Sequence, residues 1–132
     1  MITVLSPAKK LSTDCSAKGN AYTKPVFLED SDKLVSILKD YKPDQLQNLM
    51  GISQNLSELN WERFQSWTSD YAPSISREAF FSFKGDTYTG LNAESLSEKD
   101  VIFAQDNVRI LSGLYGVLKP LDLMLPYRLE MG

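Results

Sequence analysis

The sequence of 132 residues contains no histidine and a single cysteine, Cys15. The absence of histidine excludes serine-type catalytic triads, imidazole acid–base catalysis and most zinc and non-haem iron sites, because each depends on an imidazole ring. A lone thiol cannot form a disulfide within the chain, and without an imidazole it offers no cysteine–histidine metal site. We therefore predict no metal and no cofactor, and we place Cys15 in a polar loop.

The sequence also lacks a long apolar run and a net positive charge. No stretch approaches the roughly 20 apolar residues of a transmembrane helix, and Met1–Leu5 is too short to be a secretory signal. A net charge of −3 argues against a broadly basic surface for nucleic acid, although a local cationic patch is compatible with it. These features predict a cytoplasmic protein with no membrane partner.

The residues that are present predict a mixed α/β fold, in which a central sheet begun by an N-terminal strand is surrounded by short helices. The β-branched apolar run Met1–Leu5 predicts a buried first strand, and the polar stretch 9–24 predicts a surface loop. Asp30 or Ser31 is expected to cap the first helix, and Ser97 is expected to cap the later helix that it opens. Apolar spacings of three and four residues predict helices over 27–41, 43–49, 53–60 and 61–67. Further along we expect a helix start at 76–80, a strand-like trio at 81–83, a turn at 87–92, a helix over 97–108 and a strand over 109–112.

We interpret residues 1–132 as a single domain whose fold is incomplete in this chain. The residues from Tyr127 to Gly132 are a dense mixture of polar and apolar side chains, and natural domains seldom end in such a segment. A sheet begun by Met1–Leu5 should therefore have partners beyond Gly132. On this interpretation the chain alone should expose apolar surface.

Three segments are more specific than a plain scaffold requires. They are Ser6-Pro7-Ala8-Lys9, the run Lys-Gly-Asp-Thr-Tyr-Thr-Gly-Leu at 84–91, and the stretch 111–122 that continues to Pro126-Tyr127-Arg128-Leu129-Glu130-Met131-Gly132. In this order and at this spacing they resemble the amino-terminal half of the YaaA family of peroxide-stress proteins. The similarity runs along the whole of the chain.

The resemblance implies both a role and a fold. It implies a cytosolic protein of the peroxide-stress response that limits free intracellular iron, and so limits the oxidative damage that iron promotes. It also implies DNA binding through a positively charged cleft, on a mixed α/β fold that includes a helix-hairpin-helix element.

The best candidate for that hairpin is residues 43–60, where two short predicted helices flank Gly51-Ile52-Ser53. Helix-hairpin-helix modules use a Gly-apolar-Gly turn, so that backbone N–H groups at the start of the second helix face a phosphate. Ser53 stands where the second glycine is expected, a replacement that an N-cap position tolerates. We predict that Gly51 and Ser53 contact phosphate, with an ordinary helical hairpin as the alternative. A second glycine turn at 113–116 ranks below it.

Polar residues within and beside the three segments are the remaining candidates. Charged side chains among apolar neighbours are generally paired or functional, and Lys and Arg that converge on one cleft would bind phosphate or carboxylate. The predicted phosphate-binding residues are Lys9, Lys84, Arg109 and Arg128. The other cleft candidates are Ser6, Asp86, Tyr88, Tyr115 and Glu130, with Asp86 or Glu130 as base and Tyr88 or Tyr115 as proton donor in a catalytic site. The alternative is that Lys84–Asp86 and Arg128–Glu130 form structural ion pairs.

Two functions fit these residues. The first is binding of double-stranded DNA without sequence specificity, since no segment is patterned to present Arg, Asn or Gln to groove edges. The second is an enzyme that acts on an anionic small molecule or nucleotide in the same cleft. The sequence leaves open the oligomeric state and the route by which iron falls.

Overall fold

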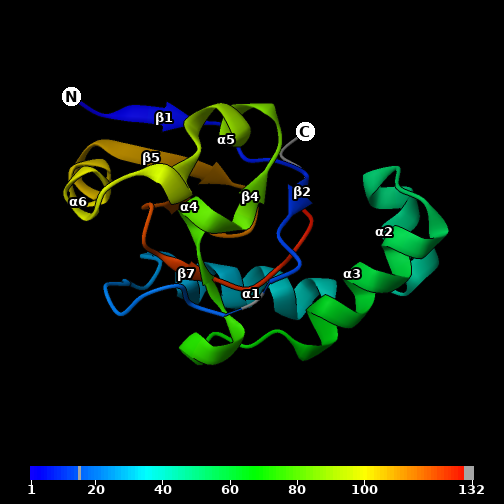
Figure 1. Ribbon diagram of the computed structural model, residues 1–132. Helices are drawn as coiled ribbons and strands as arrows, with labels where there is room; N and C mark the ends of the chain where they lie inside the picture. Colours follow the sequence, from blue (N-terminus) through cyan, green and yellow to red (C-terminus); the bar gives the residue numbers. More distant parts are fainter. Residues whose placement is uncertain (15, 130–132) are drawn as a thin grey trace.

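The computed structural model describes residues 1–14 and 16–129 and confirms a mixed α/β fold (Figure 1). Its α-helices are α1 (Leu28–Leu38), α2 (Pro43–Met50), α3 (Gln54–Ser66), α4 (Ala79–Ser82), α5 (Asp86–Leu91) and α6 (Glu98–Asn107). Its strands are β1 (Thr3–Leu5), β2 (Lys10–Leu11), β3 (Arg77–Glu78), β4 (Phe83–Lys84), β5 (Val108–Ser112), β6 (Gly116–Leu118) and β7 (Leu123–Met124). Short 3₁₀ turns, η1 (Pro73–Ile75) and η2 (Ala93–Ser95), precede β3 and α6.

The strands form one three-stranded sheet and two short ladders. The sheet has the order β1-β5-β6, in which β1 runs parallel to β5 and β6 runs antiparallel to it. The ladders are the antiparallel pairs β2–β4 and β3–β7. The parallel strands β1 and β5 are connected by a long crossover, residues 6–107, whose last element is α6.

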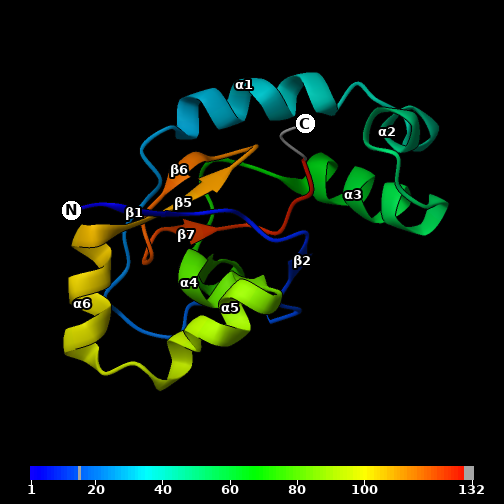
Figure 2. The same cartoon turned by 90° about the horizontal axis from the view of Figure 1, so that it is seen from above.

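The core lies between the sheet and the helices around it. Figure 2 shows α1 on one side of β5 and β6, with α4 and α5 on the other side. Ile110 and Leu118 of the sheet are fully buried, and Phe64 of α3 is buried in the same cluster. Ser31 Oγ donates to the carbonyl of Leu114 at 2.9 Å, which ties α1 to the turn between β5 and β6.

The first strand forms where the sequence predicts it, but it is not buried. Val4 is 54% exposed and Ile2 is 52% exposed. Among the described strands β1 pairs with β5 alone, so it is an outer strand whose side chains have few neighbours. Ile102 and Phe103 of α6 are also exposed. Exposed apolar side chains therefore occur at β1 and α6.

The helical predictions are confirmed between residues 28 and 66, with two differences. The predicted helices at 53–60 and 61–67 are one continuous helix, α3, and Ser53 caps it. Helix α1 has no side-chain cap, because Ser31 lies inside the helix and its hydroxyl is bonded to Phe27 and Leu114 carbonyls. The predicted cap at Ser97 is confirmed by the hydrogen bond from the Asp100 N–H at 3.2 Å.

Residues 76–92 differ most from the sequence prediction. The predicted helix start at 76–80 contains the strand β3, because Arg77 and Glu78 pair with Met124 and Leu123. The expected strand at 81–83 is confined to Phe83, which begins β4, and the expected turn at 87–92 is the helix α5. At β3 and β4, pairing with a distant segment overrides the local pattern.

Candidate functional site

The first and third sequence segments meet at one edge of the sheet. Ser6 follows β1, and Ser112 ends β5. Because β1 and β5 are parallel, with Leu5 opposite Ile110, their carboxyl ends lie at the same edge. Ligands of open parallel sheets generally bind at such an edge. We call the surface formed by residues 6–11, 84–88, 112–115 and 127–128 the carboxyl edge.

The second segment reaches the same edge through two contacts, and Gly85 passes close to Ala8. The hydroxyl of Tyr88 donates to the carbonyl of Ser6 at 2.5 Å. In the β2–β4 ladder Lys10 lies opposite Lys84. At Gly85, which has φ +137°, a side chain would meet the Ala8 Cβ at 3.5 Å and would strain the backbone. Segments far apart in the sequence are therefore brought together.

Hydrogen bonds of Tyr115 and Tyr127 hold the third segment in the core. Ser112 Oγ lies 2.6 Å from the Tyr127 hydroxyl and accepts the Tyr115 N–H at 3.0 Å. The Tyr115 hydroxyl accepts from Trp67 Nε1 at 3.1 Å and from the Leu125 N–H at 2.9 Å. Tyr115 has no exposed surface, so this cleft candidate is a structural residue and not a solvent-facing proton donor.

Burial keeps the phenols of the carboxyl edge neutral. It raises the pKa of Tyr127 to about 12, against the smaller opposite effect of the hydrogen bond with Ser112. Burial also raises the pKa of Tyr115, and it raises the pKa of Tyr88 with a further contribution from the nearby Tyr127. At neutral pH these side chains are hydrogen-bonding groups, and none of them is a phenolate nucleophile.

Lysines outnumber acids where the first two segments meet. Residues 6–11 and 84–91 contain Lys9, Lys10 and Lys84 against the single acid Asp86. Lys9, Lys10 and Asp86 are exposed, and Lys84 is half-buried. Lys84 borders a hollow of about 160 Å³ that Tyr88 and Glu94 also line.

Of the other predicted residues, Arg128 lies near this edge and Arg109 does not. Arg128 follows Tyr127 directly, and Figure 1 shows this end of the described chain beside β2. The Arg109 guanidinium donates to the carbonyls of Gln105 at 2.8 Å and Val108 at 2.7 Å, where it caps the end of α6. Glu130 lies outside the described residues.

At the predicted hairpin two helices, α2 and α3, are joined by a short turn, and the helix-hairpin-helix element is not confirmed. Gly51 ends α2 in the left-handed conformation at φ 63°, and Ser53 Oγ accepts the Leu56 N–H at 3.2 Å at the start of α3. Both residues are exposed. Residues 43–60, however, contain Asp44 and Glu58 and no Lys or Arg. Capping accounts for both turn residues, and the local charge does not favour an anion.

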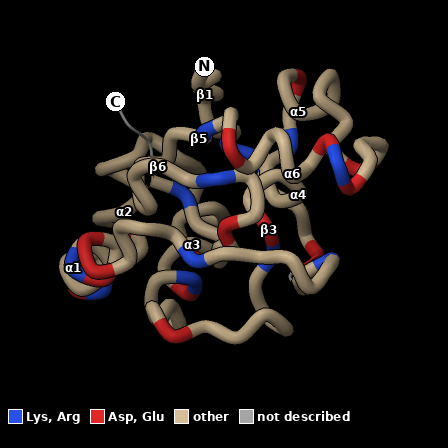
Figure 3. The backbone as a smooth tube through the Cα atoms, turned by 90° about the vertical axis from the view of Figure 1, so that its left-hand side faces the viewer, with Lys and Arg blue, Asp and Glu red and all other residues tan. Residues whose placement is uncertain are grey.

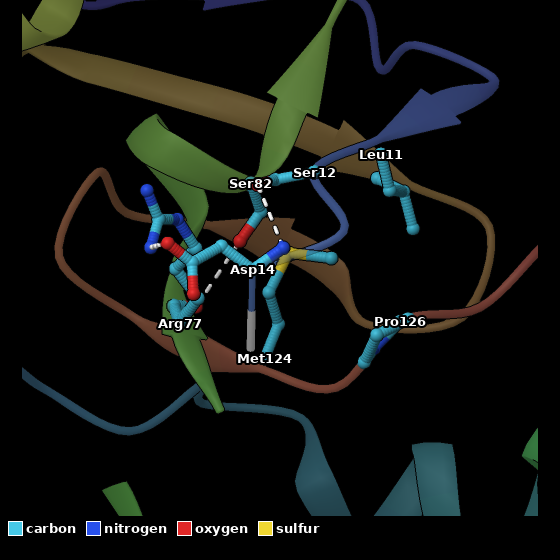
Figure 4. A pocket seen from close by; sticks show the side chains of 7 residues that line it. All are labelled: Leu11, Ser12, Asp14, Arg77, Ser82, Met124 and Pro126. Carbon is cyan, nitrogen blue, oxygen red and sulfur yellow. Dashed lines mark hydrogen bonds and ion pairs between the residues drawn. The ribbon is translucent and has the colours of Figure 1, made fainter. Parts of the chain in front are cut away.

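The sequence prediction missed a buried pair of charged residues, Arg77 and Glu78. The Arg77 guanidinium donates to the Phe81 carbonyl at 3.0 Å and lies 3.4 Å from Asp14 and 3.7 Å from Glu94. Figure 4 shows Arg77 and Asp14 at a small cavity of about 10 Å³, the size of one water molecule. The sequence feature that could have indicated their burial is the position of this Arg-Glu pair immediately before the apolar run 79–81.

In residues 1–14 and 16–129 no group of three or more His, Cys, Asp and Glu side chains could hold a metal ion. No helix in that part of the chain is long and apolar enough to cross a membrane. Figure 3 shows basic and acidic positions side by side along the chain, so any cationic surface is local.

Comparison with known proteins identifies relatives along the entire chain. The profile of the family described as peroxide stress protein YaaA matches residues 1–132. A UPF0246 protein of Burkholderia orbicola is 48% identical over 132 residues, which cover 100% of this chain and 51% of the relative. A UPF0246 protein of Burkholderia lata matches with the same identity and coverage. The chain thus spans about half the length of these curated relatives.

Proposed function

The chain belongs to the family of the peroxide stress protein YaaA, and on that premise we propose that it acts in the cytoplasm to limit free iron and binds double-stranded DNA. Binding uses phosphate contacts at the carboxyl edge and does not read the base sequence. The observation that carries the proposal is the position of Lys10 directly opposite Lys84 in the β2–β4 ladder. Like charges directly opposite each other destabilise a strand pair, so an anion between them would relieve a cost that the fold carries.

The type of side chain favours phosphate over base contacts. Lysine acts as a point charge toward phosphate, whereas direct readout of bases depends on bidentate Arg, Asn or Gln. The basic groups of the first two segments are Lys9, Lys10 and Lys84. An edge of lysines on short strands supports contact with a sugar–phosphate backbone.

An enzyme acting on an anionic small molecule or nucleotide is the second candidate, and the neutral hydroxyls of Tyr88 and Tyr127 favour it. The hollow beside Lys84 measures about 160 Å³, however, and pockets for small molecules generally measure 300–1,000 Å³. An extended polyanion lying across the edge suits this geometry better than an enclosed nucleotide.

The test is a salt titration of duplex DNA with the full protein and with the double variant Lys10→Glu/Lys84→Glu. We expect the double variant to lose at least about tenfold in affinity and to lower the slope of log affinity against log salt by about 2, because two phosphate contacts are lost. The control is Lys33→Glu on the exposed face of α1, which should bind like the native protein.

Two results would contradict this function. Unchanged affinity and slope in the double variant would remove the carboxyl edge from DNA binding. Saturable nucleotide binding with turnover, lost in the same variant, would favour the enzyme.

A further inference from the structure

A hollow separate from the carboxyl edge lies between the loop after β2 and helix α6. It measures about 540 Å³, within the size range of small-molecule pockets, and it is open to solvent. Residues 18–21 line one part of it, and the apolar part of its wall comes from Phe81 of α4, Leu96 before α6, Val101 and Ile102 of α6, and Leu121 before β7. An apolar wall of this kind would hold the hydrocarbon part of a ligand.

One of the polar groups at this hollow is a buried carboxylate. Glu78 is only 2% exposed, yet it contributes to the lining. Its oxygens accept the Lys18 N–H at 2.9 and 3.2 Å and the Gly19 N–H at 3.2 Å. A carboxylate has about four acceptor positions, so two backbone donors leave room for a further one. A buried negative charge is stabilised best by a cation that also donates hydrogen bonds.

The one cation among the described lining residues is engaged elsewhere. Lys18 also lines the hollow, but its Nζ lies 2.7 Å from Glu94 Oε1 and 5.0 Å from the centre of the Phe81 ring. This hydrogen bond from Lys18 lowers the pKa of the Glu94 carboxyl, with smaller contributions from the charges of Lys84 and Arg77. The remaining charged residue of the lining is Glu98, so the unpaired charge at the hollow is negative.

We propose that this hollow binds a small organic cation, a primary amine or amidine carried on an apolar body. The ammonium group donates to the Glu78 carboxylate, and the apolar body lies against Phe81, Val101 and Ile102. Glu98 at the start of α6 adds attraction at the rim. The site shares no residue with the Lys10–Lys84 pair, so it stands or falls independently of DNA binding.

Three probes of one shape and different charge test the proposal: benzylamine, benzyl alcohol and benzoate. The measurement is the titration of backbone amide NMR signals of the full protein, with Lys18 and Gly19 as reporters because their N–H groups bind Glu78. We expect saturable shifts at both signals with benzylamine, at least about tenfold weaker binding of benzyl alcohol, and none of benzoate. Equal affinity for amine and alcohol, or shifts confined to other residues, would overturn the proposal.

Variants separate charge recognition from packing. Glu78→Gln keeps the shape and removes the charge, so it should abolish the preference for benzylamine over benzyl alcohol. Glu98→Gln, at an exposed position, should weaken benzylamine binding about twofold to fivefold by removing an attraction across solvent. The matched control, Glu62→Gln on α3, should change nothing. If Glu78→Gln loses its circular dichroism spectrum, the ratio of amine to alcohol affinity in the native protein decides alone.

Discussion

The carboxyl edge and the α2–α3 hairpin were both predicted to contact phosphate, and the structure distinguishes them by how their residues are held. At the hairpin, Gly51 and Ser53 cap their own helices, so local helix geometry explains them. At the edge, Tyr88 bonds to Ser6 across 82 residues, and Lys10 meets Lys84 through a strand pair. Contacts between distant segments bring particular side chains together on one surface, whereas caps recur in any helical protein. The edge is therefore the stronger candidate.

The two regions also differ in charge, and this difference again favours the carboxyl edge over the hairpin. Residues 43–60 contain two acids and no base, while the first two edge segments contain three lysines and one acid. A helix start attracts an anion with an energy of about 0.3–1 kcal/mol at an exposed position. Nearby acids of the same helices offset an attraction of that size. A motif shape whose own residues, 43–60, carry no base is weak support for DNA binding, although Lys42 and Arg63 flank it.

The largest expected difference between the two regions is in stability. Tyr115→Ala should lower the free energy of unfolding by about 3–5 kcal/mol, because it removes a fully buried ring and leaves the Trp67 indole and the Leu125 N–H without their acceptor. Leu49→Ala on α2, where the side chain is 53% exposed, should cost about 1 kcal/mol or less. Urea unfolding of both variants measures the difference. Equal losses would show that the carboxyl edge is no better packed than the hairpin.

Alkaline pH should loosen the edge and leave the hairpin unaffected. Burial raises the pKa of Tyr71, Tyr88, Tyr115 and Tyr127, and residues 43–66 contain no tyrosine. A raised folded-state pKa contributes stability that is fully present below the ordinary phenol value near 10, and that stability is lost as pH rises through about 12 for Tyr127.

Urea unfolding at a series of pH values above 9 measures this loss. Tyr127→Phe should flatten the alkaline decline relative to the native protein, because one titrating phenol is gone. A decline of the same steepness in the variant would show that Tyr127 does not contribute to it.

The parts of the fold that the sequence predicts are those fixed by neighbours in the chain. Pro43, Gly51, Ser53 and Ser97 mark helix ends correctly, because caps and prolines act within a few residues. The strand β5 and the mixed α/β class follow from local patterns as well. The exposure of β1 could not be predicted, since burial depends on which strands and helices pack beside it.

The candidate site divides in the same way. Basic residues beside small turn residues in both segments suggested that Lys84 and Tyr88 meet the first segment. The structure places Tyr88 next to Ser6 and Lys84 opposite Lys10. Arg109 was grouped with them because it is a charge among apolar residues, yet that description also fits a side chain that caps α6. Glu78 was missed because its partners, the N–H groups of Lys18 and Gly19, are backbone groups that leave no pattern in the sequence.

The smallest expected effect is that of a substitution in the hairpin on DNA affinity. Ser53→Asp keeps the cap, since Asp caps a helix about as well as Ser, and it places a negative charge where a phosphate would lie. Gly51 is unsuited to this test because its φ of +63° would strain any larger residue. We expect Ser53→Asp to weaken duplex binding by less than about threefold, because residues 43–60 supply no basic group to hold a phosphate there.

The matched control is Ser97→Asp. The native Ser97 hydroxyl accepts the Asp100 N–H at 3.2 Å, just as the Ser53 hydroxyl accepts the Leu56 N–H at 3.2 Å. A loss of tenfold or more in Ser53→Asp alone would move the phosphate contact from the carboxyl edge to the hairpin.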